Sequence, residues 1–143
     1  FLGEQFLSRA PYEQVWDFGN NWFERLNWFY WYPWEDYDHL IDHHTFQDLI
    51  VDILLSFQSN KKIKIKRLVT ELDKKSPKWI SFSRSYDPAR WKKHFLLNVV
   101  IDPMEKLGIL HLESGDDPSE IVYFVDDFQV TDFGKSILKY FKR

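Results

Sequence analysis

The chain has 143 residues, of which 44% are hydrophobic and 29% charged, a composition typical of one globular domain that buries about 70% of its unfolded surface. It contains no cysteine, which excludes disulfide frameworks and thiolate metal sites and favours a reducing, cytoplasmic location. No apolar run approaches the ~18 residues that a membrane span needs, and no signal-peptide pattern precedes the first elements. Because the chain starts at Phe1 and holds one methionine, we expect a fragment of a larger protein.

The net charge of −3 conceals a strong asymmetry along the chain. Residues 1–58 carry two basic and ten acidic side chains, residues 59–93 carry twelve and three, and residues 94–143 carry five and nine. A segment of +9 between acidic flanks of −8 and −4 indicates a polyanionic partner. The alternative is a solvated lysine-rich surface that pairs with the acidic flanks of the same molecule.

Residues 1–44 read as an aromatic-rich helical extension, with a helix over 12–32 that a proline at position 33 ends. Eleven aromatic residues fall within residues 16–37. A helix would point the densest run to all sides, and one domain cannot bury every face. We therefore expect a docking or dimerisation surface, facing a second copy or the remainder of a larger protein. Its residues are Trp28, Phe29, Tyr30, Trp31, Tyr32 and Trp34.

A second helix is predicted from Thr45, taken as its N-cap, to about Ser59, because apolar residues recur at i, +3, +4, +7, +8 and +11 from Phe46. The stretch "KKIKIK" then alternates isoleucine with lysine, as an edge strand does. "KRLVTELDKK" returns to helical spacing, and residues 76–86 form a connection.

The third main helix opens at Asp87-Pro88, an N-cap followed by a proline at the first helical position, and covers residues 88–101. Asp102-Pro103 repeats this signal and predicts a further turn or kink that ends at Gly108. "GILHLES" and "IVYFVDDFQV" predict two strands joined by the turn-rich "GDDPSE". Thr131 is expected to cap a closing helix with Phe133, Ile137 and Phe141 on one face.

From residue 45 to 143 this order, with "EKLGILHLES" and a Phe128-x-Val130-Thr131-x-x-Gly134 turn after the hairpin, resembles the winged helix-turn-helix superfamily. The expected fold class is therefore mainly α with a small β-hairpin (α+β), in which residues 1–44 precede a winged-helix domain of residues 45–143. The resemblance implies that the helix over 88–101 takes the place of the recognition helix and that the protein binds duplex DNA, as a transcription regulator or DNA-processing protein does.

The polar residues of that helix can be read independently. Arg90, Lys93, His94 and Asn98 form one stripe, and Arg and Asn side chains are suited to base edges. Cations outside the helix would hold the phosphate backbone. The residues assigned to this second role are Lys62, Lys64, Lys66, Arg67 and Arg84.

The alternative function is a winged-helix protein-interaction module that binds no DNA. It is favoured by the acidic hairpin tip "ESGDDPSE", because a phosphate backbone would repel these carboxylates. An enzyme is not expected, and neither is a cofactor or a metal ion. His39 and His43 at i, i+4 could share a helix face and bind zinc, but Asp42 replaces the glutamate of the H-x-x-E-H pattern and no third ligand stands out.

Overall fold

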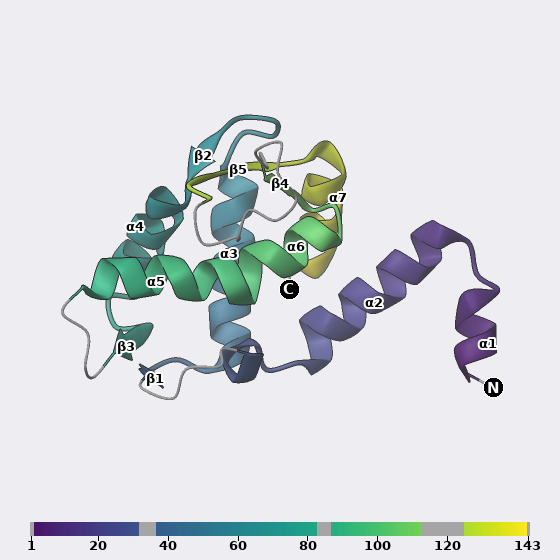
Figure 1. The fold of residues 1–143 in the computed structure, drawn as a ribbon, viewed down its shortest axis with the longest axis horizontal. Coiled ribbons are helices and arrows are strands. Elements are labelled where there is room, and N and C mark those ends of the chain that lie inside the picture. The colour runs from purple at the N-terminus through teal and green to yellow at the C-terminus, as the bar shows by residue number, and fades with distance from the viewer. Residues whose placement is uncertain (1, 32–36, 83–86, 113–124, 143) are drawn as a thin grey trace.

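The computed structural model describes residues 2–31, 37–82, 87–112 and 125–142 (Figure 1). Helices surround a small three-stranded sheet, and a second sheet of two strands lies at the opposite end of the body (Figure 1). The fold is therefore mainly helical with a small antiparallel sheet, as the sequence predicts, whereas the two-stranded sheet is unexpected. In chain order the elements are α1 Leu2–Leu7, α2 Pro11–Arg25, η1 Trp28–Trp31, β1 Tyr37–His39, α3 His43–Ser56, β2 Ile63–Lys64, α4 Ile65–Lys75, β3 Ile80–Phe82, α5 Pro88–Leu96, η2 Leu97–Ile101, α6 Asp102–Lys106, β4 Leu110–Leu112, β5 Asp127–Val130 and α7 Asp132–Phe141.

The helix predicted over residues 12–32 is divided in two. α2 ends at Arg25 because Leu26 adopts an extended conformation. The side chain of Asn27 then accepts a hydrogen bond from the amide of Phe29 at 3.1 Å and starts the short 3₁₀ helix η1. Asparagine competes with helical backbone bonds in this way, and the uninterrupted helix is a wrong prediction.

Two short strands lie where the sequence predicts none. β1 pairs antiparallel with β3, with Tyr37 opposite Phe82 and His39 opposite Ile80. β3 thus belongs to the segment interpreted as a plain connection between helices. Three-residue strands carry little periodic signal, and their pairing joins segments about forty residues apart, so local patterns do not report them.

The helix α3 begins three residues earlier than predicted. Its N-cap is Asp42, whose carboxylate accepts hydrogen bonds from the amide and hydroxyl of Thr45 at 2.9 and 2.7 Å. Thr45 is therefore a partner of the cap and not the cap itself. These two hydrogen bonds also lower the pKa of the Asp42 carboxyl. The following strand β2 is shorter than expected, because Ile65 is buried as the first residue of α4.

The longest helical run consists of α5, a π-helical turn η2 and α6 in one continuous path (Figure 1). Asp87 caps α5 by accepting from the amide of Arg90 at 3.2 Å, as predicted. The wider turn of η2 comes just before Pro103, which has no amide to donate and would crowd a regular α-helix. Asp102 does not cap a new helix: its carboxylate accepts from Lys106 at 2.7 Å instead.

Gly108 ends this run as predicted. It has a positive φ of 75°, and its amide donates to Glu105 while the amide of Ile109 donates to Met104, both at 2.9 Å. This pair of bonds closes the helix and turns the chain into β4. β5 pairs with β4 on one side and with β2 on the other, so the strand order is β2-β5-β4.

One buried cluster unites the molecule, and it runs across the boundary expected at residue 44. Trp28 and Phe29 are fully buried within it, in ring contact with Phe46. The indole of Trp28 donates to the carbonyl of Trp22 at 3.2 Å, which satisfies its only polar atom. The prediction that these two rings form a docking surface is therefore wrong: they fill the core between η1 and α3. Over the described part of the chain, no helix has both the length and the apolar character needed to cross a bilayer.

Candidate nucleic-acid interface

The exposed side of α5 presents fewer free groups than its sequence stripe suggests. Phe95, Leu96 and Val99 are buried, as the sequence predicts for the apolar side of this helix. Arg90 lies exposed in the first turn, next to the capping Asp87. Its guanidinium is therefore the group of this helix that is most open to an incoming ligand.

Lys93 lies one turn further along α5 and is held within the molecule. Its ammonium forms an ion pair with Asp126, the residue before β5. This contact lowers the pKa of the Asp126 carboxyl, first through the hydrogen bond from Lys93 and then through its charge. Lys93 is thus not a free cation of the kind that the stripe predicts.

His94 and Asn98 are half-buried and face different surroundings from Arg90. Burial lowers the pKa of His94, and the positive charge of Arg90 lowers it further, so the ring is neutral near pH 7. The side chain of Asn98 donates to the carbonyl of His94 at 2.8 Å and lines a groove beside α2. The structure therefore does not bring Asn98 together with Arg90 on one open surface.

The helix α4 presents the more open basic surface. Ile65, Leu68 and Leu72 are buried and define its inner side. The exposed side is mostly cationic, with one half-buried glutamate that pairs with Lys74 at 3.1 Å. The guanidinium of Arg67 lies 5.1 Å from the ring centre of Phe57, a cation–π contact that leaves its charge in solvent. We call this surface the α4 basic face; its residues are Lys66, Arg67, Thr70, Lys74 and Lys75.

The lysines that precede α4 lie at the edge of the three-stranded sheet. Lys64 is exposed and pairs with Asp127 of the neighbouring strand at 3.7 Å, a weak surface contact. Lys62 is exposed in the loop before β2. Arg84, the remaining predicted DNA contact, lies outside the described residues, as do Tyr32, Trp34 and the acidic hairpin tip.

A polar contact that the sequence does not predict connects α4 with α5. Asp73 accepts from the indole of Trp79 at 3.0 Å and from the ammonium of Lys92 at 2.7 Å. Lys92 is only 15% exposed, and its ammonium lies 6.0 Å from the Trp79 ring centre. These three residues set how the two helices meet, and no local pattern connects positions 73, 79 and 92.

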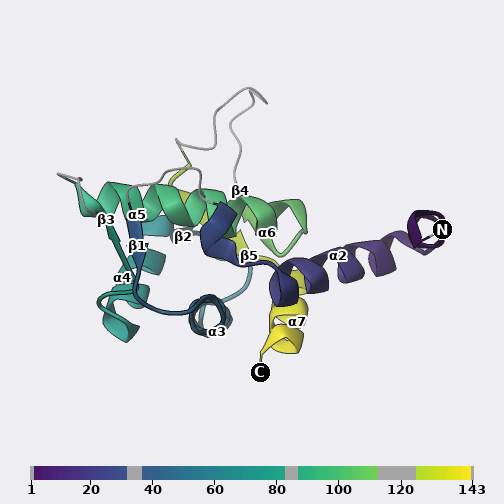
Figure 2. The same ribbon diagram turned by 90° about the horizontal axis from the view of Figure 1, so that it is seen from below.

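The N-terminal arm, defined as residues 2–25, leads away from the body (Figures 1 and 2). The part of α2 nearest the body is anchored on α7, where Phe23 stacks on Phe141 with ring centres 4.4 Å apart. Towards α1 the apolar side chains are open, with Leu7 73% and Phe18 60% exposed. A groove of about 510 Å³ separates the arm from η2 and α6; its walls include Phe6, Val15, Phe18, Trp22, Pro103 and Leu107.

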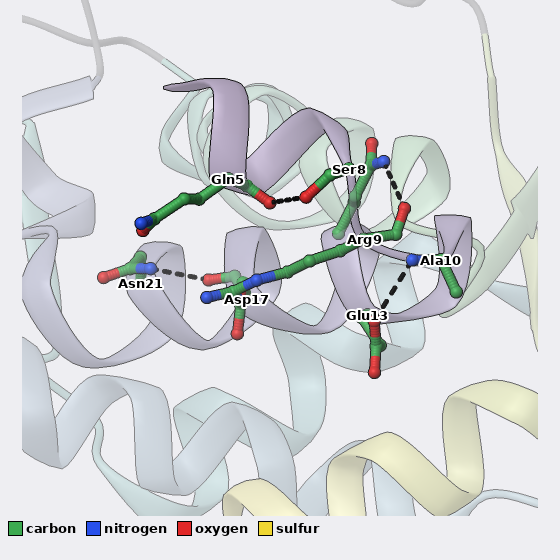
Figure 3. A network of polar contacts seen from close by, with 8 residues as sticks. Gln5, Ser8, Arg9, Ala10, Glu13, Asp17 and Asn21 are labelled. Atoms are coloured by element: carbon green, nitrogen blue, oxygen red, sulfur yellow. Dashed lines mark hydrogen bonds and ion pairs between the residues drawn. The ribbon is translucent and has the colours of Figure 1, made fainter. Parts of the chain in front are cut away.

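Polar contacts fix the bend between α1 and α2. Arg9 reaches along α2 to form an ion pair with Asp17, as Figure 3 shows. The amide of Ala10 donates to Glu13 at 3.1 Å, and the side chain of Gln14 donates to the carbonyl of Arg9 at 2.8 Å. The arm is therefore a pair of helices joined by a bend that these contacts hold. The helical spacing of its apolar residues is the sequence signal from which the arm could have been predicted.

The possible zinc pair is not assembled as one helix face. His39 belongs to β1 and stacks on Phe29 with ring centres 4.3 Å apart, whereas His43 opens α3. Asp42 is engaged as the α3 cap. Within the described residues, no group of three potential ligands could hold a metal ion.

Comparisons with models of protein families, with curated proteins and with solved structures gave no match to this chain.

Proposed function

We propose that this chain is a winged-helix module that binds duplex DNA through the α4 basic face and the first turn of α5. The order α3, β2, α4, α5, β4, β5 and the strand order β2-β5-β4 support this architecture. β2 pairs with β5, so the short strand between α3 and α4 joins β4 and β5 in one sheet. The long connection between α4 and α5 is accommodated by β3, which pairs with β1.

The α4 basic face is the observation that carries the proposal. Within the described residues, the side chains of Lys66, Lys75 and Arg90 form no ion pair, whereas those of Lys92 and Lys93 do. Exposed cations on one helix attract a phosphate backbone and release its counterions, which makes the affinity fall with salt. α4 therefore supplies sequence-independent contacts that position the module on the duplex.

Arg90 is the group that we assign to base recognition. It lies in the first turn of α5, where recognition helices contact base edges, and its guanidinium suits a guanine edge. His94 and Asn98 are half-buried and carry less of this role than the sequence predicts. Base selectivity should therefore be narrow, with one arginine contact per module.

The test is a fluorescence-anisotropy titration of a labelled random 20-base-pair duplex at several salt concentrations. We expect log K to fall linearly with log salt, with a slope of about −0.9 for each phosphate contact. Replacing Lys66 and Arg67 by glutamine should weaken binding and make the slope shallower by up to about 1.8.

The matched control replaces Lys139 of α7 and Lys142, which follows that helix, by glutamine. Both residues are exposed, the net charge changes equally, and α7 lies on the other side of α3 from α4 (Figures 1 and 2). This variant should bind like the wild type. Wild-type protein that shows no binding at low salt would refute the proposal.

A second candidate function, assembly with another copy without DNA, is favoured by the exposed apolar stripe of the arm. The same stripe on two copies can pack around a two-fold axis, with Val15 and Phe18 at its centre. The arm, and not the buried Trp28 and Phe29, would then form the dimer surface.

Light scattering after gel filtration tests this candidate over a range of protein concentrations. A dimer that the Phe18→Ser substitution dissociates, together with absence of DNA binding, would support assembly as the function. Leu40→Ser, just after β1, is the control, since Leu40 is exposed to a similar degree and lines no part of the groove. A wild-type monomer at all concentrations would eliminate it.

A further inference from the structure

Two neighbouring carboxylates at the base of the hairpin pair with cations from two other elements. Asp126 binds Lys93 of α5, and Asp127 binds Lys64 of β2. Lys93 and Lys64 are both among the residues that the sequence assigns to DNA. Asp126 and Asp127 therefore occupy cations that a phosphate would otherwise contact.

The backbone holds these carboxylates in place. The amide of Ile65 donates to the carbonyl of Asp126 at 2.8 Å. Asp127 lies directly opposite Lys64 in the antiparallel pairing of β5 with β2. Directly opposed residues of antiparallel strands have neighbouring Cβ atoms, so opposite charges at these positions attract each other. The contact of Asp127 thus follows from the sheet register, and that of Asp126 from the packing of α5 beside the start of β5.

We propose that Asp126 and Asp127 are an internal competitor of phosphate, which restrains binding of DNA by this module. The inference rests on the proposed function and adds its regulation. A phosphate that approaches Lys93 must first displace the carboxylate of Asp126, because both anions use the same ammonium. Weak, non-specific binding is suppressed most, since it depends on phosphate contacts alone. At a DNA site with a suitable base edge, the additional contact of Arg90 would favour displacement of Asp126 from Lys93 by phosphate.

The two ion pairs predict which of the two carboxylates restrains DNA binding more. Lys93 is 27% exposed as a side chain, so its ammonium is accessible once Asp126 is neutral. Lys64 is 74% exposed and pairs at a longer distance, so removal of Asp127 should matter less. The order of effects, Asp126 before Asp127, distinguishes a specific competitor from general acidity.

The experiment compares wild-type protein with Asp126→Asn and Asp127→Asn in the salt titration with the labelled duplex. Asp126→Asn should tighten binding about fivefold and steepen the salt slope by about 0.9, the contribution of one freed cation. The control is Asp52→Asn, which causes the same charge change and also breaks an ion pair, that of Asp52 with Lys142 at 3.4 Å. Circular dichroism of each variant checks that the fold is retained.

A double-mutant cycle locates the effect on the ammonium of Lys93. In the Lys93→Ala background, the Asp126→Asn substitution should no longer steepen the salt slope, because the ammonium that Asp126 covers is absent. If the wild type binds DNA and all three asparagine variants bind with unchanged affinity, or with equally increased affinity, the inference is overturned and the proposed function stands. Absence of binding by every variant would overturn the proposed function as well.

Discussion

The backbone of Gly134 in α7 packs directly on the carbonyl oxygen of Ile109, and a Cβ at Gly134 would collide with it. Thr131, three residues earlier, accepts a hydrogen bond from the Gly134 amide at 2.8 Å and donates to the carbonyl of Gly108 at 2.7 Å. The Thr-x-x-Gly turn therefore has a physical purpose. It caps α7 and lets that helix sit against the chain that leaves α6.

Replacing Gly134 by alanine should destabilise the fold by about 3 kcal/mol, because the rigid backbone of Ile109 must move to admit the methyl group. Urea denaturation measures the loss. The control is Gly19→Ala in α2, where the added Cβ would lie 3.7 Å from Leu107 and Phe141, an ordinary contact distance. That substitution should stabilise by ~0.5–1 kcal/mol, since alanine is the better helix former. Equal effects at the two glycines would contradict the close approach.

The hydroxyl of Thr131 should contribute separately from its size. Thr131→Ala removes the cap and should cost about 1–2 kcal/mol in urea denaturation. Thr131→Ser keeps the hydroxyl and should cost less than half as much. If serine and alanine were equally destabilising, the methyl group and not the cap would be the important part of the side chain.

The contact of Asp73 with Trp79 and Lys92 should matter more than other surface charges on α4. Asp73→Ala leaves the buried indole and a largely covered ammonium without their acceptor, and should cost about 1–2 kcal/mol after allowance for the partial exposure of Asp73. Glu71→Ala on the same helix breaks only the exposed pair with Lys74 and should change stability by less than ~0.5 kcal/mol. Thermal unfolding of both variants tests this difference, and a reversed order would refute it.

Stability should fall as the pH is lowered from 7.5 to 5.5, in part because of His94. Burial and the charge of Arg90 lower the pKa of His94 below its ordinary value of 6.5. The unfolded chain then takes up a proton at a higher pH than the folded chain, so acidification favours unfolding. The His94→Gln variant should lose less stability than the wild type over this pH range. The other histidines are present in both proteins, so their contributions cancel in the difference. Carboxylates such as Asp126, whose pKa is lowered from 3.8, act only at lower pH.

Removal of Arg90 provides a check on the cause. Arg90→Ala removes the second of the two influences, so the pKa of His94 should rise and the loss of stability between pH 7.5 and 5.5 should shrink. The loss of stability in Arg90→Ala should still exceed the loss in His94→Gln, because burial is the main cause of the lowered pKa of His94. Urea denaturation at both pH values decides this, and a loss in His94→Gln equal to that of wild type would exclude a role for the ring.

Features of the chain that depend on near neighbours could be read from the sequence. The apolar spacing from Phe46 predicts α3, Asp87-Pro88 opens α5, Gly108 ends α6 and Thr131 caps α7. Helical period, capping and glycine at positive φ act within a few residues, so a sequence pattern is sufficient to find them. The mainly helical class with a small hairpin follows from these signals.

Features that depend on distant partners were decided only by the tertiary structure. Trp28 and Phe29 look available for docking until η1 places them against Phe46, and Lys93 looks free until β5 brings Asp126 to it from 33 residues away. Burial and ion pairing depend on which surfaces meet after folding. For this reason the sequence by itself determined which residues carry positive charge and aromatic rings, whereas the packing of the helices determined which of them remain available to a partner.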